Sequence, residues 1–367
     1  MNESNSKNTI KPIIMNANSL AGVLLENDQK FLSEINQVYE NALREFTNIS
    51  QNKLENDLTG QNLSTQKIID IFERLGQQMG DFAKDESRLQ IYSFALPTES
   101  HVEVSRLIAK LRDLKTGQAE FIYYIQRAYE LLFKLVYSAP NIVDRSFKIV
   151  KTPVNHPVQN FAVHKMPNVD NLVKDTVMCV MLRGALLPSM ILSKEIQEYA
   201  TNEMITPFAL FRIKRNEQKD LQNMEYILEP KNSYFNPEIL DNKDLLFADP
   251  MNATGGSTVA VVNYLKSIGI KPKSVLCFNV IASLKGMLQV IRSIENAKVY
   301  TLWVDPVLNH KAYIMPGLGD AGDRLNGVDN QYSPREIIQL IADYGANITN
   351  LYRTQVREIE KTVLNLK

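Results

Sequence analysis

The feature that most constrains the fold is a regular alternation of apolar, β-branched runs with amphipathic stretches from residue 145 onward. The strand-like runs are TVMCVML, ITPFALFRI, LLFAD, SVLCFNVIA and KVYTLWV, and the helix-like stretches between them include ALLPSMILSKEIQEYA, TVAVVNYLKSIG and GMLQVIRSIE. Strands that alternate with helices at this spacing form βαβ units, and nearly continuous apolar strands belong to a parallel sheet covered on both faces. We therefore predict an α/β fold built on a parallel sheet.

Helical patterns stand on both sides of this alternation. Residues 28–49 and 64–83 carry apolar side chains at helical spacing, so they predict two amphipathic helices joined by the polar stretch QNKLENDLTGQN. The apolar stripe of this hairpin must pack on the rest of the chain, on a second subunit or on a partner. Thr116 is expected to cap the next helix, and Ser333, Pro334 and Glu336 predict the start of a C-terminal helix.

Composition narrows the class of protein. The 367 residues contain 44% apolar side chains and as many basic as acidic ones, 41 of each. This balance is typical of a globular protein and disfavours a nucleic-acid or membrane-surface partner. No apolar run reaches a membrane span, the Asn/Ser-rich start is a poor targeting peptide, and Cys179 and Cys277 are predicted to be buried thiols. We expect a cytoplasmic protein.

The stretch DPMNATGGST, residues 249–258, follows a strand and precedes a helix. Gly255 and Gly256 let backbone amides surround an anion, and the helix start adds the positive end of its dipole. Asp249 at the strand end suits the hydroxyls of a sugar whose phosphate lies in this cup. An ordinary turn between strand and helix is the alternative, because two glycines alone are a weak signal. His101, His156, His164 and His310 are scattered and form no ligand set.

The segment DPMNATGGS resembles the phosphoribosyl-pyrophosphate (PRPP) loop of type I phosphoribosyltransferases, in the version of uracil phosphoribosyltransferase. A second segment, YIMPGLGDAGDR at 313–324, is similar to the uracil-binding segment of that family. HVEVSRLIAKLRDLKTGQAEF, IVKTP, VMLRGALL and IKRNE resemble further family segments in the same order. The resemblance predicts a phosphoribosyltransferase-like domain at 96–330, an N-terminal helical extension at 1–95 and a C-terminal helical extension at 331–367.

The resemblance also implies roles for residues. Arg183 and Arg215 would hold the pyrophosphate, Asp249 the ribose hydroxyls, and the loop backbone the 5′-phosphate. Main-chain groups of Ile314, Gly319 and Ala321 would read uracil. Asp320 would contact uracil and face PRPP or a water on Mg²⁺, an ion held mainly through PRPP and water. The implied catalytic residues are Asp249, Arg183, Arg215 and Asp320, and the remaining PRPP-binding residues are Pro250, Met251, Asn252, Ala253, Thr254, Gly255, Gly256 and Ser257.

The activity that the resemblance implies is transfer of ribose 5-phosphate from PRPP to uracil, which gives UMP and diphosphate. The implied partners are these substrates, a nucleotide effector such as GTP, and further copies of the chain in a homodimer or larger oligomer. The alternative is a PRPP- or UMP-binding regulatory protein with little turnover that acts through the helical extensions. A transferase for another pyrimidine is a third hypothesis.

Several features depart from the family pattern or concern residues that support the loops and the core. Asn252 stands where the family has leucine, and Gly184 and Ala185 reverse the usual Ala-Gly order. Residues 217–244 correspond to a flexible, dimer-contacting arm but lack its usual motif. Asp323 and Arg324 are expected to pair and brace their loop, and Tyr313 and Trp303 are expected in the core.

Overall fold

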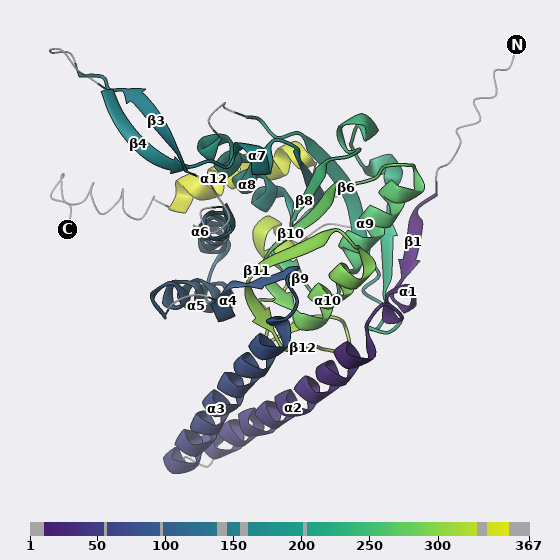
Figure 1. The fold of residues 1–367 in the computed structure, drawn as a ribbon. Helices are drawn as coiled ribbons and strands as arrows, with labels where there is room; N and C mark the ends of the chain where they lie inside the picture. The colour runs from purple at the N-terminus through teal and green to yellow at the C-terminus, as the bar shows by residue number, and fades with distance from the viewer. Residues whose placement is uncertain are drawn as a thin grey trace, which may run out of the picture.

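A computed structural model describes residues 11–54, 57–95, 98–137, 145–154, 161–200, 204–328 and 336–351. Its centre is a nine-stranded sheet in the order β1-β7-β6-β5-β8-β10-β11-β2, with β9 paired to β10 (Figure 1). The strands of this sheet are β1 (Ile13–Asn16), β2 (Leu89–Ile91), β5 (Thr176–Leu182), β6 (Phe208–Arg215), β7 (Glu225–Leu228), β8 (Asp244–Ala248), β9 (Met251–Asn252), β10 (Ser274–Ser283) and β11 (Ala297–Asp305).

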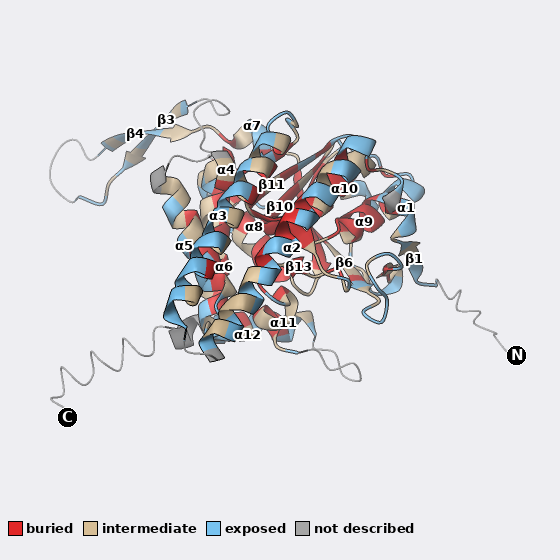
Figure 2. Ribbon diagram, turned by 90° about the horizontal axis from the view of Figure 1, so that it is seen from below, coloured by how far each residue is buried: buried red, intermediate tan, exposed pale blue. Residues whose placement is uncertain are grey.

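The predicted parallel sheet is confirmed. Strands β6, β5, β8, β10 and β11 run parallel, and Val275 on β10 lies between Leu245 on β8 and Ala297 on β11. Because βαβ crossovers are right-handed, α8 (Leu186–Tyr199) covers one face, while α9 (Gly256–Ser267) and α10 (Leu284–Ser293) cover the other. Buried residues therefore concentrate in the strands and on the helix surfaces that face them (Figure 2).

Helix α6 (Gln118–Tyr137) packs beside α8 and against β10 and β11. Its side chains Phe121, Tyr129 and Phe133 are fully buried, and the Tyr129 hydroxyl donates to the Phe278 carbonyl at 3.2 Å. The predicted burial of Cys179 and Cys277 in the neighbouring strands is confirmed, and both are free thiols. Among the described helices, none has the length and apolar content that a membrane crossing requires.

The N-terminal segment supplies strands to both edges of this sheet. Strand β1 pairs antiparallel with β7, and β2 pairs parallel with β11. Both are short and lie far from their partners in sequence, so no local pattern marks them. They cover backbone groups that would otherwise form open sheet edges. The domain boundary at residue 95 stays a prediction, and the segment before it contributes directly to the sheet.

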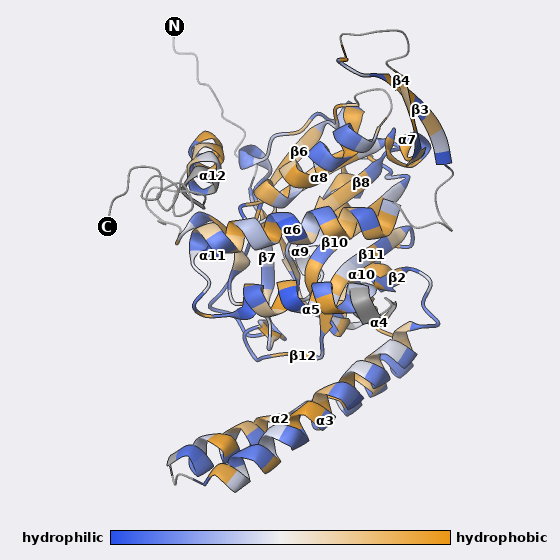
Figure 3. Ribbon diagram, turned by 90° about the vertical axis from the view of Figure 1, so that its left-hand side faces the viewer, coloured by the Kyte–Doolittle hydropathy of each residue, from blue (hydrophilic) through white to orange (hydrophobic). Residues whose placement is uncertain are grey.

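The predicted helical hairpin consists of α2 (Glu26–Leu54) and α3 (Leu58–Ala83), and it projects from the body (Figures 1 and 3). The polar stretch 51–62, expected to be the short loop between the helices, lies largely within them, because α2 runs to Leu54 and α3 begins at Leu58. Polar side chains are compatible with an exposed helix surface, and the Asp57 side chain caps α3 by accepting a hydrogen bond from the Gly60 amide at 3.0 Å. Ile35, Tyr39 and Leu75 near the body are buried.

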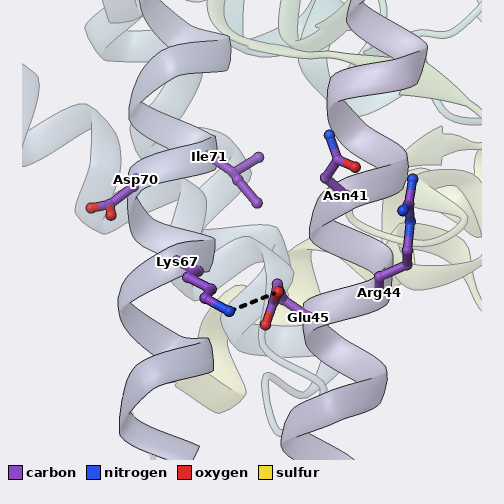
Figure 4. A pocket seen from close by; sticks show the side chains of 6 residues that line it. All are labelled: Asn41, Arg44, Glu45, Lys67, Asp70 and Ile71. Carbon is purple, nitrogen blue, oxygen red and sulfur yellow. Dashed lines mark hydrogen bonds and ion pairs between the residues drawn. The ribbon is translucent and has the colours of Figure 1, made fainter.

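The far half of the hairpin is more exposed. A groove of about 290 Å³ lies between its helices, and Figure 4 shows the side chains that line it, which are polar except for Ile71. Lys67 Nζ lies 3.4 Å from Glu45 Oε1 across this groove. Leu43, Phe46 and Ile69 are 41%, 42% and 45% exposed, so the apolar stripe of the hairpin is only partly covered by the rest of the chain.

The remaining elements connect these layers. Thr116 does not act as the predicted cap of α6, because its hydroxyl donates to the Lys110 carbonyl at 2.7 Å and closes the turn that follows Arg112. Ser333 and Pro334 lie outside the described residues. The elements not yet given are α1 (Asn18–Ala21), α4 (Tyr92–Ala95), α5 (Thr98–Arg112), α7 (Asp170–Val173), α11 (Ala321–Asn326), α12 (Ile337–Leu351), β3 (Arg145–Lys151), β4 (Phe161–Pro167), β12 (Val307–Leu308), β13 (Ile314–Met315), η1 (Pro230–Asn232) and η2 (Pro237–Ile239).

The projecting β-structure differs from the expected arm at 217–244. Part of that stretch forms β7 within the central sheet, where it pairs with β6 and β1. Strands β3 and β4 pair with each other instead and extend away from the body as a separate ribbon (Figure 1). The reason is that β7 buries Tyr226 and Leu228, which places it on the sheet.

Candidate functional site

The carboxyl ends of β5, β6 and β8 border a cleft of about 1050 Å³. Ligands of open parallel sheets bind at this edge, where loops leave the strands. The cleft brings together residues that are far apart in sequence. Among the predicted site residues, those that line it are Arg183, Arg215, Asp249, Met251, Asn252, Ala253, Thr254, Gly255, Gly256, Ser257, Asp320 and Ala321.

The loop of residues 249–258, called the Gly-Gly loop below, needs its two glycines for different reasons. Gly255 has a φ of +69°, and a Cβ atom there would lie 2.7 Å from the Gly286 carbonyl oxygen. A Cβ atom on Gly256 would lie 2.0 Å from the Tyr226 ring. Tyr226, which the sequence did not mark as a site residue, also places its hydroxyl 2.6 Å from Thr254 Oγ1. The loop therefore fits only with bare backbone at these positions.

Neighbouring strand residues hold the carbonyls of the Gly-Gly loop. Ser283 Oγ donates to the Ala253 carbonyl at 2.5 Å, and Asn279 Nδ2 donates to the Asp249 carbonyl at 2.8 Å. Helix α9 begins at Gly256, and the first amides of a helix have no carbonyl acceptor within it. These amides and the helix dipole make the loop suited to an anion.

Asn252, the departure from the family pattern, is buried beneath this loop. It is 6% exposed, and its Nδ2 lies 3.5 Å from Asn279 Oδ1. Asparagine at position 252 therefore adds a polar side-chain contact beneath the loop. The backbone amides of residues 253–257, which are expected to bind the phosphate, do not depend on this side chain.

Asp249 lies at the end of β8, where its Oδ1 accepts a hydrogen bond from the Met251 amide at 3.2 Å. Burial raises the pKa of Asp249 to about 6; the Asp320 charge adds to this rise, while the Met251 amide and Arg215 oppose it. A carboxyl group with this pKa is ionised at neutral pH and becomes protonated in mild acid. Such a shift in a cleft is common at functional sites.

Asp320 has a structural contact as well as a place in the cleft. It is the N-cap of α11, and its Oδ1 accepts from the Asp323 amide at 2.9 Å. The capping bond fixes the direction of the carboxylate. Asp320 therefore lines the cleft with a side chain whose conformation is fixed by its capping bond to α11, and its role toward a ligand stays a prediction.

The two predicted arginines reach the cleft from different strands. Arg183 follows β5 and donates to Asp323 Oδ1 and to the Gly327 carbonyl, both at 2.8 Å. Arg215 ends β6; it donates to the Ala312 carbonyl at 3.3 Å and lies over the Tyr313 ring, with 5.4 Å from Cζ to the centroid. Tyr313 is half-buried and packs against this guanidinium, so it is not in the core, contrary to expectation.

The expected pairing of Asp323 with Arg324 is wrong. Asp323 pairs with Arg183, while the Arg324 guanidinium stacks on the Phe121 ring at 4.0 Å. Arg324 also donates to the carbonyls of Leu318 and Leu111, the former at 2.8 Å. Trp303 is half-buried, packs against the hydrophobic core as expected and lies beside Arg112.

Two further cations line the cleft that the sequence did not single out. Arg212 Nε and Lys214 Nζ lie 3.8 and 3.1 Å from the Glu229 carboxylate, and both belong to β6. Side chains alternate along a strand, so these two share one face and Arg215 takes the other. The alternation in RIKR, residues 212–215, is the signal by which sequence reasoning would have found them.

The segment of residues 313–324, called the Gly-rich loop below, is held from below by Asp305. The Gly317 amide donates to Asp305 Oδ2 at 2.9 Å, and Arg112 Nη2 lies 2.5 Å from Asp305 Oδ1. Burial raises the pKa of Asp305, and Arg112 opposes that rise. Ile314 lies in β13, opposite Leu308, and Gly319 has a φ of +78°. Their predicted contact with a base stays a prediction.

The described parts of the chain contain no group of three or more His, Cys, Asp or Glu side chains that would hold a metal ion alone. His101 packs near Trp303, with 5.9 Å between ring centroids, and His164 lies on β4. The carboxylates that line the cleft include Asp249 and Asp320.

Comparison with known proteins identifies the region that contains this site. The sequence profile described as uracil phosphoribosyltransferase matches residues 98–327. A uracil phosphoribosyltransferase of Dictyoglomus thermophilum is 30% identical over 227 residues, which cover 62% of this chain and 96% of that protein. One from Bifidobacterium longum subsp. infantis is 31% identical over 233 residues, with the same coverage. The solved structure of the AQ2163 protein from Aquifex aeolicus matches with a TM-score of 0.45 and 26% sequence identity. The match covers 62% of this chain and 96% of that one.

Proposed function

This chain belongs to the uracil phosphoribosyltransferase family, a family of pentosyltransferases, and on that premise we propose that it transfers ribose 5-phosphate from PRPP to uracil. The products are UMP and diphosphate. One observation carries the proposal: the Gly-Gly loop, Arg183, Arg215 and residues 320–323 of the Gly-rich loop border one cleft, although Arg183 and Asp320 lie 137 positions apart in the sequence. This arrangement provides an anion site, cations for a leaving group and main-chain groups for a base around one space.

In the proposed reaction, N1 of uracil forms a bond to C1′ of PRPP as the bond from C1′ to diphosphate oxygen breaks. The N1 proton passes to solvent, and the ribose carries positive charge in the transition state. Amides at the start of α9 bind the 5′-phosphate, and Asp249 binds the ribose hydroxyls. Arg183 and Arg215 stabilise the charge that develops on diphosphate, because guanidinium stays ionised and matches phosphate oxygens.

The residues of the cleft fit Mg²⁺ as a cofactor held partly by substrate. Asp249 and Asp320 are oxygen donors that line the same space, and the charge of Asp320 adds to the rise in the pKa of Asp249. Mg²⁺ prefers oxygen ligands and keeps several waters, so two carboxylates and PRPP oxygens would suffice. When bound, the ion would neutralise charge on the pyrophosphate.

A homodimer or larger homo-oligomer, regulation by a nucleotide such as GTP, and a cytoplasmic location belong to the same proposal. Sedimentation velocity with and without GTP tests the first two. A change of sedimentation coefficient with GTP supports a nucleotide-dependent assembly.

A second candidate is a regulatory protein that binds PRPP or UMP and acts through the helical hairpin. The observation that favours it is the exposure of Leu43, Phe46 and Ile69 on a projecting hairpin. Removing residues 1–95 is a poor test, since it also removes strands β1 and β2 from the sheet. Phe46→Ser changes the exposed face and leaves the body intact.

The deciding experiment incubates full-length protein with PRPP, Mg²⁺ and labelled uracil, cytosine or thymine, and separates the nucleotides formed. Formation of UMP supports the transferase, and a nucleotide of another base points to the third hypothesis. A folded protein that binds PRPP and forms no nucleotide supports the regulatory candidate. Phe46→Ser is the matched control, since the transferase hypothesis expects it to keep wild-type turnover.

A further inference from the structure

Asp305 is a buried charge that the proposed reaction does not use directly. It ends β11 and is 1% exposed, yet both of its oxygens have partners. Oδ1 lies 2.5 Å from Arg112 Nη2 on α5, and Oδ2 accepts from the Gly317 amide at 2.9 Å. A buried carboxylate is costly unless it is paired, so its retention at this position requires a compensating interaction.

The Gly-rich loop is held from its other side as well. Arg324 donates to the Leu318 carbonyl at 2.8 Å, and its guanidinium is braced on the ring of Phe121. The peptide group before Gly317 is thus bound to a buried charge, and the peptide group after Leu318 is bound to a guanidinium stacked on a ring. The loop has little freedom to rotate these peptides.

Gly317 makes the orientation of this segment specific. Its φ is +63°, and a Cβ atom there would lie 2.2 Å from the Ile314 carbonyl oxygen. The turn is therefore tight at Gly317 and conformationally permissive, because glycine visits many backbone conformations. A permissive residue in a tight turn keeps one conformation only where other groups hold it, and the Asp305 carboxylate is the group that binds its amide.

Helix α2 of the N-terminal hairpin closes the other side of this pair. Tyr39 on α2 is 4% exposed, and its pKa is raised by burial and also by the negative charge of Asp305, which Arg112 opposes. The phenol is therefore neutral, and both it and the Asp305 side chain are shielded from water. Charge-assisted hydrogen bonds are stronger where water does not compete.

We propose that Asp305, oriented by Arg112, is a positioning residue that sets base specificity by holding the Gly317 amide and hence the peptides on either side of it. This inference rests on the proposed function, in which main-chain groups of the Gly-rich loop read the base. Main-chain donors and acceptors distinguish uracil from cytosine only while each peptide keeps its direction. A rotated peptide leaves polar groups unpaired with either base, which removes the discrimination.

The test compares Asp305→Asn with a matched control. Asp28 is 1% exposed, like Asp305, and pairs with Arg292 on α10 at 3.0 Å, so Asp28→Asn removes an equivalent buried charge. For both variants and wild type, the KM of uracil, the KM of PRPP, kcat with uracil and with cytosine, and the melting temperature are measured. Arg112→Lys is the conservative variant, because it keeps the charge and loses the planar guanidinium.

We expect Asp305→Asn to raise the KM of uracil about tenfold, as for loss of one charge-assisted hydrogen bond, and to leave the KM of PRPP within about twofold. The preference of Asp305→Asn for uracil over cytosine should fall. Arg112→Lys should lose less of this preference than Asp305→Asn does. Asp28→Asn should lower the melting temperature without changing base preference.

Parallel changes in the two KM values, or the same loss of preference in Asp28→Asn, would overturn the inference. If Asp305→Asn does not fold, unchanged base preference in Arg112→Lys and Arg112→Gln overturns it. If calorimetry shows that wild type binds uracil but no UMP forms, the proposed transferase function fails while the inference about Asp305 remains testable. The Kd of uracil then replaces the KM, and an unchanged Kd in Asp305→Asn overturns the inference. A wild type that does not bind uracil overturns both.

Discussion

Gly255→Ala adds one methyl group at a crowded backbone position of the Gly-Gly loop that also has a positive φ. The new Cβ would lie 2.7 Å from both the Gly286 carbonyl oxygen and Val290 Cγ2. Ordinary contacts begin near 3.4 Å, so the loop or α10 must move by roughly 0.7 Å (3.4 minus 2.7). The φ of +69° adds about 1–2 kcal/mol of strain for any residue with a Cβ atom.

A displacement of this size should reduce activity more than stability. Misplacing a binding group by about 1 Å can cost roughly a hundredfold in rate, so we expect kcat/KM for PRPP to fall about 10- to 100-fold. The strain should lower the melting temperature by only a few degrees, at roughly 2–4 °C per kcal/mol in a chain of this size class. UMP formation at varied PRPP and thermal denaturation measure the two effects.

Gly269→Ala is the control for backbone strain alone. Gly269 has a φ of +91°, and nothing lies within 4 Å of the Cβ atom that alanine would add. It should therefore lower the melting temperature by a similar amount and leave kcat/KM unchanged. Wild-type activity in Gly255→Ala, or an equal loss of activity in Gly269→Ala, would refute the reasoning that crowding at the Gly-Gly loop controls PRPP binding.

Three further predictions concern the same cleft. Arg183→Gln should lower kcat by about a hundredfold, because it removes charge from the leaving-group side; initial rates with saturating PRPP measure this, and an unchanged kcat excludes the role. Asp249→Asn should abolish the fall in activity as pH drops through about 6, where the Asp249 carboxyl protonates. Because the pKa of Asp249 is raised on folding, the ionised carboxylate lowers the free energy of unfolding above pH 6, and this cost is absent below pH 4. Asp249→Asn should therefore melt at a higher temperature than wild type at pH 8 and at the same temperature at pH 4. Melting curves at both pH values check the sign. Tyr226→Phe should lose about 1 kcal/mol of stability with the Thr254 hydrogen bond and raise the KM of PRPP, which urea titration and kinetics test; no change in either would show that the hydroxyl does not support the loop.

Local patterns in the sequence were sufficient for the central elements. Apolar runs such as TVMCVML predicted β5, and helical spacing predicted α2 and α3, because burial on one or both faces leaves a periodic record in the chain. The two signatures at 249–258 and 313–324 likewise predicted the loops that border the cleft. Their roles as ligand sites stay predictions.

Contacts between distant residues were decided only by the tertiary structure. Asp323 pairs with Arg183, 140 positions away, and not with its neighbour Arg324, because β5 ends and α11 begins at the same cleft. Tyr226 reaches Gly256 because β7 joins the sheet beside β6, and Asp305 binds Gly317 because β11 ends under the Gly-rich loop. A sequence records which faces are apolar and which turns need glycine. The choice of partner for each polar group depends on strand order and register, which long-range packing determines.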